Sequence, residues 1–152
     1  MEGEDEKVVV DTYALLAIVY DEVPARAAEL LERVRRKAVR GFIPPTVIYE
    51  YVVHWLKGRI PAFKDLDEVE TYLKAYFELV DLSRGDYVKA AEVKVEGDRA
   101  LKQSRDPELR RRRLSFIDST VIASALKLEA PIVTGDVDLS YVAKLKGLEV
   151  VW

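Results

Sequence analysis

Asp118 is an acidic residue on the apolar side of a predicted helix. Apolar residues recur at helical spacing over 115–128, and Asp118 lies at the N-terminal end of the stripe that contains Ile122 and Ala125, with Thr120 on the other side. A buried carboxylate is unfavourable unless it is paired or binds a cation. The pattern therefore predicts a cation or a shared proton near Asp118.

Three more aspartates follow predicted strands. Asp11 comes directly after the apolar run 7–10, and Asp136 and Asp138 come after the run 130–134. The carboxyl ends of parallel strands meet at one edge of a sheet, where sites form in this class of fold. We therefore expect these three carboxylates to lie near Asp118.

Glu50 is a fifth candidate. It lies at the edge of the apolar stripe of a helix predicted over 46–57, which is expected to begin with Thr46 as its cap. From that edge its side chain can reach the carboxyl end of the sheet.

Each acid alone also has an ordinary structural explanation. Asp11 is typical of a helix cap, Asp136 and Asp138 of a turn, Asp118 of a capping box, and Glu50 of a solvated surface. Independent caps have no reason to gather at one edge, so the predicted convergence favours a common function.

Converging carboxylates call for a cation. Two unit charges ~5 Å apart repel by ~3 kcal/mol at an effective dielectric constant of ~20. The sequence has no cysteine and a single histidine, His54, so hard oxygen ligands select Mg²⁺ or Mn²⁺ over zinc. Such sites typically assist hydrolysis of phosphodiester bonds.

The remaining pattern predicts the scaffold for these residues. Short apolar runs alternate with helical segments, which is typical of a three-layer α/β/α fold with a central parallel sheet of about four to five strands. Strands are expected at 7–10, 42–43, 78–82, 130–134 and 148–152. Helices are expected at 13–20, 24–40, 46–57, from 65, from 83 past 101, at 115–128 and at 139–146, with Gly41 ending the second and Gly97 as a possible kink.

Composition describes a globular chain. Hydrophobic residues make up 49% and charged residues 34% of the 152 residues, and the net charge is −3. We expect an acidic flexible lead at 1–6 and one domain over 7–152, with no membrane span or signal peptide and a cytoplasmic location by default. The absence of asparagine and the abundance of Glu, Lys and Arg are typical of heat-adapted proteins.

Four segments, in this order, resemble the signature segments of PIN-domain nucleases, and most closely those of VapC-type toxin ribonucleases from toxin–antitoxin pairs. They are 8–12, 46–50, 114–123 and 133–139, and the resemblance extends over nearly the whole chain. The connector 58–77 and the segment 98–113 are longer than in compact members.

The resemblance implies a Mg²⁺- or Mn²⁺-dependent endoribonuclease for single-stranded RNA that leaves a 5′-phosphate and a 3′-hydroxyl. It implies Asp11, Glu50, Asp118 and Asp136 as catalytic metal ligands, with Asp138 as an auxiliary ligand. It also implies that Thr12 and Thr134 orient ligands or contact phosphate, and that a homodimer and a small antitoxin are partners.

Basic residues lie close in sequence to Asp118. Arg110, Arg111, Arg112 and Arg113 would attract an RNA backbone, or alternatively form a solvated surface. His54, one turn after Glu50, is interpreted as a boundary residue rather than a proton shuttle.

Rival functions fit the sequence less well. A haloacid-dehalogenase-type phosphatase needs a second aspartate two residues after its nucleophile, but Tyr13 occupies that position relative to Asp11. A receiver domain needs paired acids before its phosphorylated aspartate, and this sequence lacks them. A catalytically silent RNA- or protein-binding module with the same fold stays open as an alternative.

Overall fold

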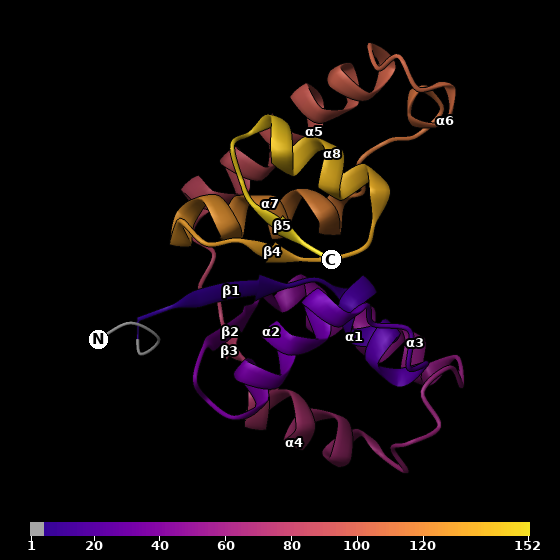
Figure 1. Cartoon of the computed structure of the whole chain (residues 1–152), viewed down its shortest axis with the longest axis vertical. Coiled ribbons are helices and arrows are strands. Elements are labelled where there is room, and N and C mark those ends of the chain that lie inside the picture. Colours follow the sequence, from indigo (N-terminus) through magenta and orange to yellow (C-terminus); the bar gives the residue numbers. More distant parts are fainter. Residues whose placement is uncertain (1–4) are drawn as a thin grey trace.

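The computed structural model describes residues 5–152, which form five strands among a series of helices (Figure 1). The strands are β1 Lys7–Val10, β2 Arg40–Ile43, β3 Glu78–Leu79, β4 Ile132–Val133 and β5 Val150–Val151. The helices are α1 Thr12–Val19, α2 Ala25–Arg35, α3 Pro45–Leu56, α4 Leu66–Tyr76, α5 Arg84–Lys102, α6 Pro107–Arg110, α7 Phe116–Leu128 and α8 Val137–Leu145.

All strand pairs are parallel, in the order β3-β2-β1-β4-β5, which confirms the predicted α/β sheet. The chain moves outward from β1 through β2 to β3 and then returns to place β4 on the other side of β1. The register pairs Val10 with Val133, so the residues that follow β1 and β4 emerge side by side. This reversal of strand order is where doubly wound sheets form their sites.

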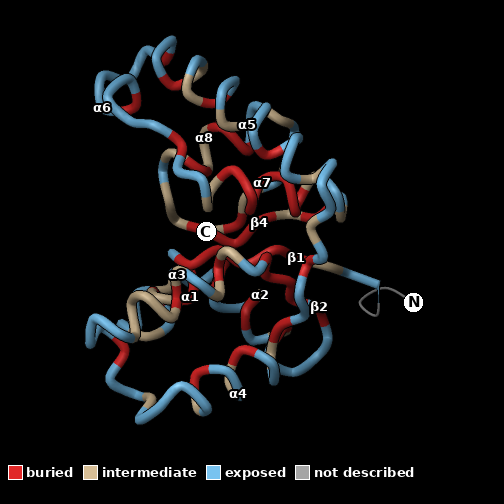
Figure 2. Tube along the Cα trace, turned by 180° about the vertical axis from the view of Figure 1, so that it is seen from behind, coloured by how far each residue is buried: buried red, intermediate tan, exposed pale blue. Residues whose placement is uncertain are grey.

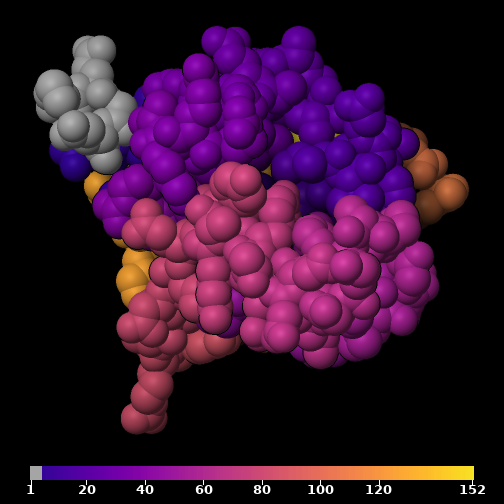
Figure 3. All heavy atoms as spheres, turned by 90° about the horizontal axis from the view of Figure 1, so that it is seen from below, coloured from indigo at the N-terminus to yellow at the C-terminus, as the bar shows by residue number. Residues whose placement is uncertain are grey.

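The helices cover both faces of the sheet. Right-handed crossovers place helices on opposite faces when the direction along the sheet reverses. Accordingly, α1 to α4 lie on one side of β1, and α5 to α8 lie on the other (Figure 1). Seen from below, the surface is made by the first two thirds of the sequence, with the last segments largely hidden behind them (Figure 3).

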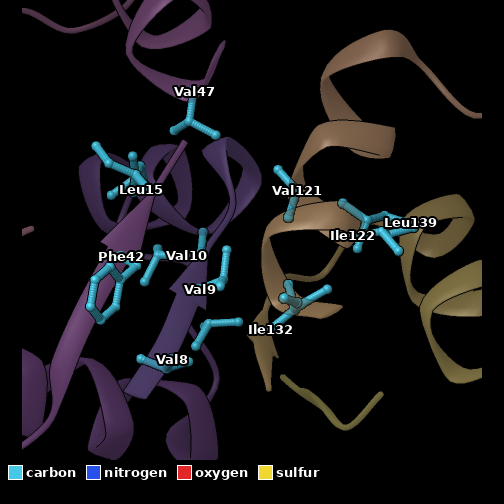
Figure 4. Packing of buried hydrophobic residues seen from close by; sticks show 14 of the residues in the cluster. Val8, Val9, Val10, Leu15, Phe42, Val47, Val121, Ile122, Ile132 and Leu139 are labelled. Carbon is cyan, nitrogen blue, oxygen red and sulfur yellow. The ribbon is translucent and has the colours of Figure 1, made fainter. Parts of the chain in front are cut away.

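The core lies where β1 and β4 meet α7. Val8, Val9 and Val10 are essentially inaccessible and Ile132 lies close to them, while Ile122 of α7 lies next to Leu139 in the same core (Figure 4). Burying each such side chain contributes roughly 1.5–3 kcal/mol. The buried stretches coincide with β1, β4 and α7, whereas α4, α5 and α6 carry long exposed stretches (Figure 2). The strand ends that carry the acids are therefore attached to the most deeply buried part of the molecule.

The boundaries of the second helix and of the next strand differ from the prediction. Helix α2 ends at Arg35, because Lys37 adopts a left-handed conformation with φ 65° that stops the helix. Gly41 belongs to β2 and does not end the helix. A Cβ there would lie 2.6 Å from a Val34 methyl group, so glycine allows α2 to pack on the strand.

The start of α3 and the middle of α5 also differ. Pro44 and Pro45 begin α3, and Thr46 does not cap it. Gly97 lies within the continuous helix α5, where a Cβ would come within 3.1 Å of Val142 and 3.2 Å of Leu114. Its small size allows close packing of α5 against its neighbours.

Other predicted ends are confirmed. Ser83 begins α5 with a full capping box with Asp86, and Asp65 accepts a hydrogen bond from Glu68 N at 2.9 Å at the start of α4. Residues 1–4 of the expected acidic lead lie outside the described residues. Glu6, the last residue of that lead, pairs with Arg33 at 3.1 Å. Within residues 5–152 no helix is both long enough and apolar enough to cross a bilayer.

Candidate active site

Asp11 lies between the end of β1 and the start of α1, and its side chain is 2% exposed. It occupies the N-cap position, but its carboxylate makes no capping hydrogen bond, so the capping explanation fails here. Oδ2 instead accepts a hydrogen bond from Thr134 Oγ1 at 2.8 Å. Burial raises the pKa of Asp11 to about 7; the Thr134 bond lowers it, and the charges of Asp136 and Glu50 raise it.

Asp118 lies in the first turn of α7, and the helix is capped by Ser115, whose Oγ accepts a hydrogen bond from Asp118 N at 3.0 Å. The main chain of Asp118 therefore takes part in the cap, which leaves the carboxylate available to the cluster. Burial, followed by the charges of Asp11 and Asp136, raises the pKa of Asp118 to about 8, although hydrogen bonds with Ser115 oppose this shift. Two acids with raised pKa values thus face the same space.

The predicted polar side of α7 is wrong. Thr120 and Ser124 are fully buried, since each hydroxyl donates to a carbonyl of its own helix, Ile117 O at 2.7 Å and Thr120 O at 2.7 Å. The hydroxyls of Thr46 and Thr120 also lie 2.6 Å apart and join α3 to α7. Glu50 lies one turn after Thr46 on α3 and is half-buried.

Asp136 and Asp138 follow β4. Asp136 caps α8, because its Oδ1 accepts a hydrogen bond from Leu139 N at 3.0 Å, and its own N–H donates to Thr134 Oγ1 at 3.1 Å. Asp138 Oδ1 lies 3.3 Å from Arg112 Nη1, although outside hydrogen-bond geometry. Burial and the charge of Asp136 raise the pKa of Asp138, while Arg112 lowers it.

All five predicted acids line one open pocket of about 350 Å³, together with Thr12. Its wall also includes Arg113, one of the arginines that the sequence interpretation expected to attract RNA, together with Tyr13 and His54, to which that interpretation gave no place in the site. Tyr13 was within reach of prediction because it follows Asp11 and Thr12 directly. Desolvation lowers the pKa of His54, as does the neighbouring Arg59, whose Nη1 lies 3.0 Å from His54 Nδ1.

The arginine run divides in the structure, and only Arg113 lines the pocket. Arg112 contacts Asp138, as described above. Arg110 donates to the carbonyls of Ser104 and Arg105 at 3.2 Å each, and Arg111 is exposed near Glu108 at 3.9 Å. The four residues therefore do not form one basic surface on the pocket.

The anchoring of this run comes from α5. Asp98 Oδ1 accepts a hydrogen bond from Leu114 N at 2.8 Å, and Lys94 Nζ donates to Leu114 O at 2.5 Å and pairs with Asp98 at 2.7 Å. The main-chain N–H and carbonyl of Leu114, which lies between Arg113 and Ser115, are thus both held by side chains of α5.

The side chains that line the pocket offer oxygen atoms, which are the ligands that a hard divalent cation prefers. The pocket supplies carboxylate oxygens, and the buried hydroxyl of Thr12 has no hydrogen-bond partner among the described residues. Within residues 5–152 no group of three carboxylates or imidazoles is placed to hold an ion with the side chains as they stand. Burial and neighbouring carboxylates raise the pKa values of both Asp11 and Asp118, which shows why a cation would stabilise this arrangement.

Comparisons with known proteins agree with this architecture. The family model described as the PIN domain matches residues 8–145. The fold is similar to that of PAE2754 from Pyrobaculum aerophilum, with 19% identity, a TM-score of 0.60, and coverage of 99% of this chain and 88% of that one. It is also similar to VapBC2 from Rickettsia felis, solved bound to a DNA fragment from its promoter, with 17% identity, a TM-score of 0.55, and coverage of 95% and 96%. These likenesses confirm the predicted PIN-like fold, and no curated protein matches the chain.

Proposed function

Because this chain belongs to the PIN domain family, as the match over residues 8–145 shows, we propose that it is a metal-dependent endoribonuclease acting on single-stranded RNA. The observation that supports this proposal most is one pocket, located where the strand order reverses between β1 and β4. It is lined by Asp11, Glu50, Asp118 and Asp136. Buried acids whose pKa values are raised by burial and by neighbouring carboxylates, as those of Asp11 and Asp118 are, have little structural use without a cation.

In this proposal Asp11, Glu50, Asp118 and Asp136 hold Mg²⁺ or Mn²⁺, and Asp138 is an auxiliary ligand. When bound, such an ion activates a water for attack on phosphorus and neutralises charge on the phosphate. Thr134 orients the Asp11 carboxylate through the hydrogen bond of 2.8 Å.

Two other residues of the pocket act on the substrate. The hydroxyl of Thr12 is free to donate to a phosphate oxygen, and the guanidinium of Arg113 attracts the RNA backbone. Arg110, Arg111 and Arg112 have less direct roles, because their nearest charged or carbonyl partners lie within the protein.

The test uses labelled single-stranded RNA. We expect cleavage with Mg²⁺ or Mn²⁺, with 5′-phosphate and 3′-hydroxyl products, and no cleavage with EDTA. Asp11→Asn should reduce the rate at least ~100-fold, while Asp81→Asn, a matched change at an exposed loop residue, should not. Cleavage that persists in EDTA, or no cleavage of any RNA, would refute the proposal and favour a silent binding module.

We also propose that the chain is the toxin of a toxin–antitoxin pair with a small protein partner. A groove of about 360 Å³ between α1, α2 and α4 is lined by apolar side chains, including Ile18, Leu31 and Tyr76, and it suits an apolar segment of such a partner. The test is expression in bacteria with and without the adjacent reading frame. Growth arrest that the second protein relieves is expected, and unaffected growth would refute this role.

A homodimer is the second assembly that we propose. Tyr49 and Leu56 of α3 are 68% and 67% exposed, and Phe116 at the start of α7 is 61% exposed. Apolar side chains this open are typical of interfaces. Light scattering should give the mass of a dimer, and Tyr49→Glu should yield a monomer; a monomeric parent protein would refute the assembly.

A further inference from the structure

A second cavity, of about 460 Å³, lies beside the acidic pocket. One wall is a single stripe of α8, since Ser140, Tyr141 and Lys144 are spaced at helical intervals and all line it. Trp152, just after β5, also lines the cavity. A cavity of this size is within the range of small-molecule and cofactor sites.

The two cavities share a boundary. Thr134 and Gly135 line the second cavity, while Thr134 also binds Asp11 in the first. Tyr13 lines the acidic pocket, and its ring meets that of Trp152 edge to face, with centroids 5.4 Å apart and planes at 82°.

Gly135 is required for this arrangement. A Cβ at that position would lie 2.4 Å from the Trp152 ring and 2.6 Å from the Tyr13 ring. Glycine therefore lets the two rings close over the chain just before Asp136. A strand of RNA with its phosphate at the acids would have a neighbouring nucleotide at this aromatic pair.

The chemistry of the second cavity differs from that of the first. No aspartate or glutamate side chain is among its described lining residues, whereas five line the acidic pocket. Its rings are Tyr141 and Trp152, both half-buried, which leaves part of each ring accessible. Aromatic side chains of this kind stack on nucleobases at roughly 1–3 kcal/mol per base.

Polar groups in this cavity are available to a ligand. Within residues 5–152 the Trp152 indole N–H and the Ser140 hydroxyl donate no hydrogen bond, and Lys144 makes no ion pair. The nearby Arg26 is paired with Glu149 at 3.1 Å, so Lys144 is the cation that remains for a phosphate. The aromatic rings and the indole N–H match the base of one nucleotide, and the Lys144 ammonium group matches its phosphate.

We infer that this cavity is a nucleotide subsite of the RNA path, in which Trp152 and Tyr141 stack on the base next to the cleaved bond and Lys144 binds its phosphate. The inference rests on the proposed RNA substrate. It assigns to this cavity the selection of the nucleotide next to the reacting phosphate. A purely apolar ligand would leave Lys144 and the indole N–H without partners.

The test measures binding apart from cleavage. The sequence has two tryptophans, Trp55 and Trp152, so Trp55→Phe leaves Trp152 as the only indole. In this background, with Asp11→Asn to stop cleavage, we titrate a short single-stranded oligoribonucleotide in Mg²⁺ and follow fluorescence. We expect saturable quenching, and an abasic nucleotide next to the cleavage position should weaken binding about 10-fold.

Two variants test the residues. Lys144→Glu should weaken binding and lower the slope of log affinity against log salt by about 1. Ser140→Leu, which fills the cavity, should abolish the quenching. Lys74→Glu on the distant helix α4 makes the same charge change and should bind like the parent (Figure 1).

Failure of this inference differs from failure of the proposed function. If the parent protein cleaves RNA but Trp152 fluorescence does not respond, or if Lys144→Glu and Lys74→Glu bind equally, the subsite is refuted and the nuclease remains. If the parent protein neither binds nor cleaves RNA, both proposals are refuted.

Discussion

Replacing Asp118 by asparagine should make the metal-free protein more stable. Burial and the charges of Asp11 and Asp136 raise the pKa of Asp118 from 3.8 to about 8. Between these two values the folded protein holds a proton that the unfolded chain releases. The folded state is therefore favoured at low pH, and stability falls as the pH rises from about 4 to about 8.

The size of the effect follows from that shift. Each pH unit above the ordinary value of 3.8 costs the folded state about 1.4 kcal/mol, which gives roughly 4 kcal/mol at pH 7. Asparagine has the same shape and no charge, and Ser115 still caps α7 because its bond is to the main chain of residue 118. We expect a gain of about 2–4 kcal/mol, or roughly 5–15 °C in Tm for a chain of this size.

Thermal unfolding in EDTA at several pH values is the assay. The difference in Tm between Asp118→Asn and the parent should be near zero at about pH 3, below the ordinary pKa of 3.8, where the acid is mostly neutral in both states, and largest near pH 8. Mg²⁺ should then raise the Tm of the parent more than that of the variant. Asp81→Asn serves as the control, with no such difference. A lower Tm for Asp118→Asn at pH 7, or a difference that is independent of pH, would refute the reasoning.

Two further predictions concern the residues around the site. Thr134→Val removes the hydroxyl that donates to Asp11 at 2.8 Å. Because that bond lowers the pKa of Asp11, the free energy of unfolding in EDTA should fall by about 1–3 kcal/mol above pH 8 and by less at pH 5. An equal loss at both pH values would contradict this role of Thr134. For Asp98, desolvation raises the pKa, but the bonds from Lys94 and Leu114 outweigh it and lower the pKa overall. Its contribution is therefore present at neutral pH and lost as the pH falls through the lowered pKa. Asp98→Ala should cost about 1–3 kcal/mol at pH 7 by denaturant unfolding and little in strong acid, and a cost that persists in strong acid would contradict the assignment.

The convergence of acids could be predicted because it depends on topology alone. Asp11 and Asp136 each follow a buried run, and the edge rule for parallel strands brings them together without knowledge of any side chain. The scaffold was similarly accessible, since the valines of β1 and the capping box at Ser83 are local signals.

Other features could not be read from the sequence because they depend on tertiary packing. Thr120 is polar by type, yet it is buried, since a helix main chain satisfies its hydroxyl. Successive residues in the turn after α6 point in different directions, so Arg112 and Arg113 have different partners although they are adjacent. The end of α2 at Arg35 depends on a left-handed Lys37 that no residue type announces.

The sheet order has a consequence for synthesis on the ribosome. The strands β1, β2 and β3 are made in the order in which they pair, so this half of the sheet can form as the chain emerges. Strand β4, which stands next to β1, is made after all of them, and Asp136 follows it. The carboxylate cluster therefore cannot assemble until residue 136 has left the ribosome. Under the proposed function, the chain therefore has no complete active site to cut the message that encodes it for most of the time that the message is being read.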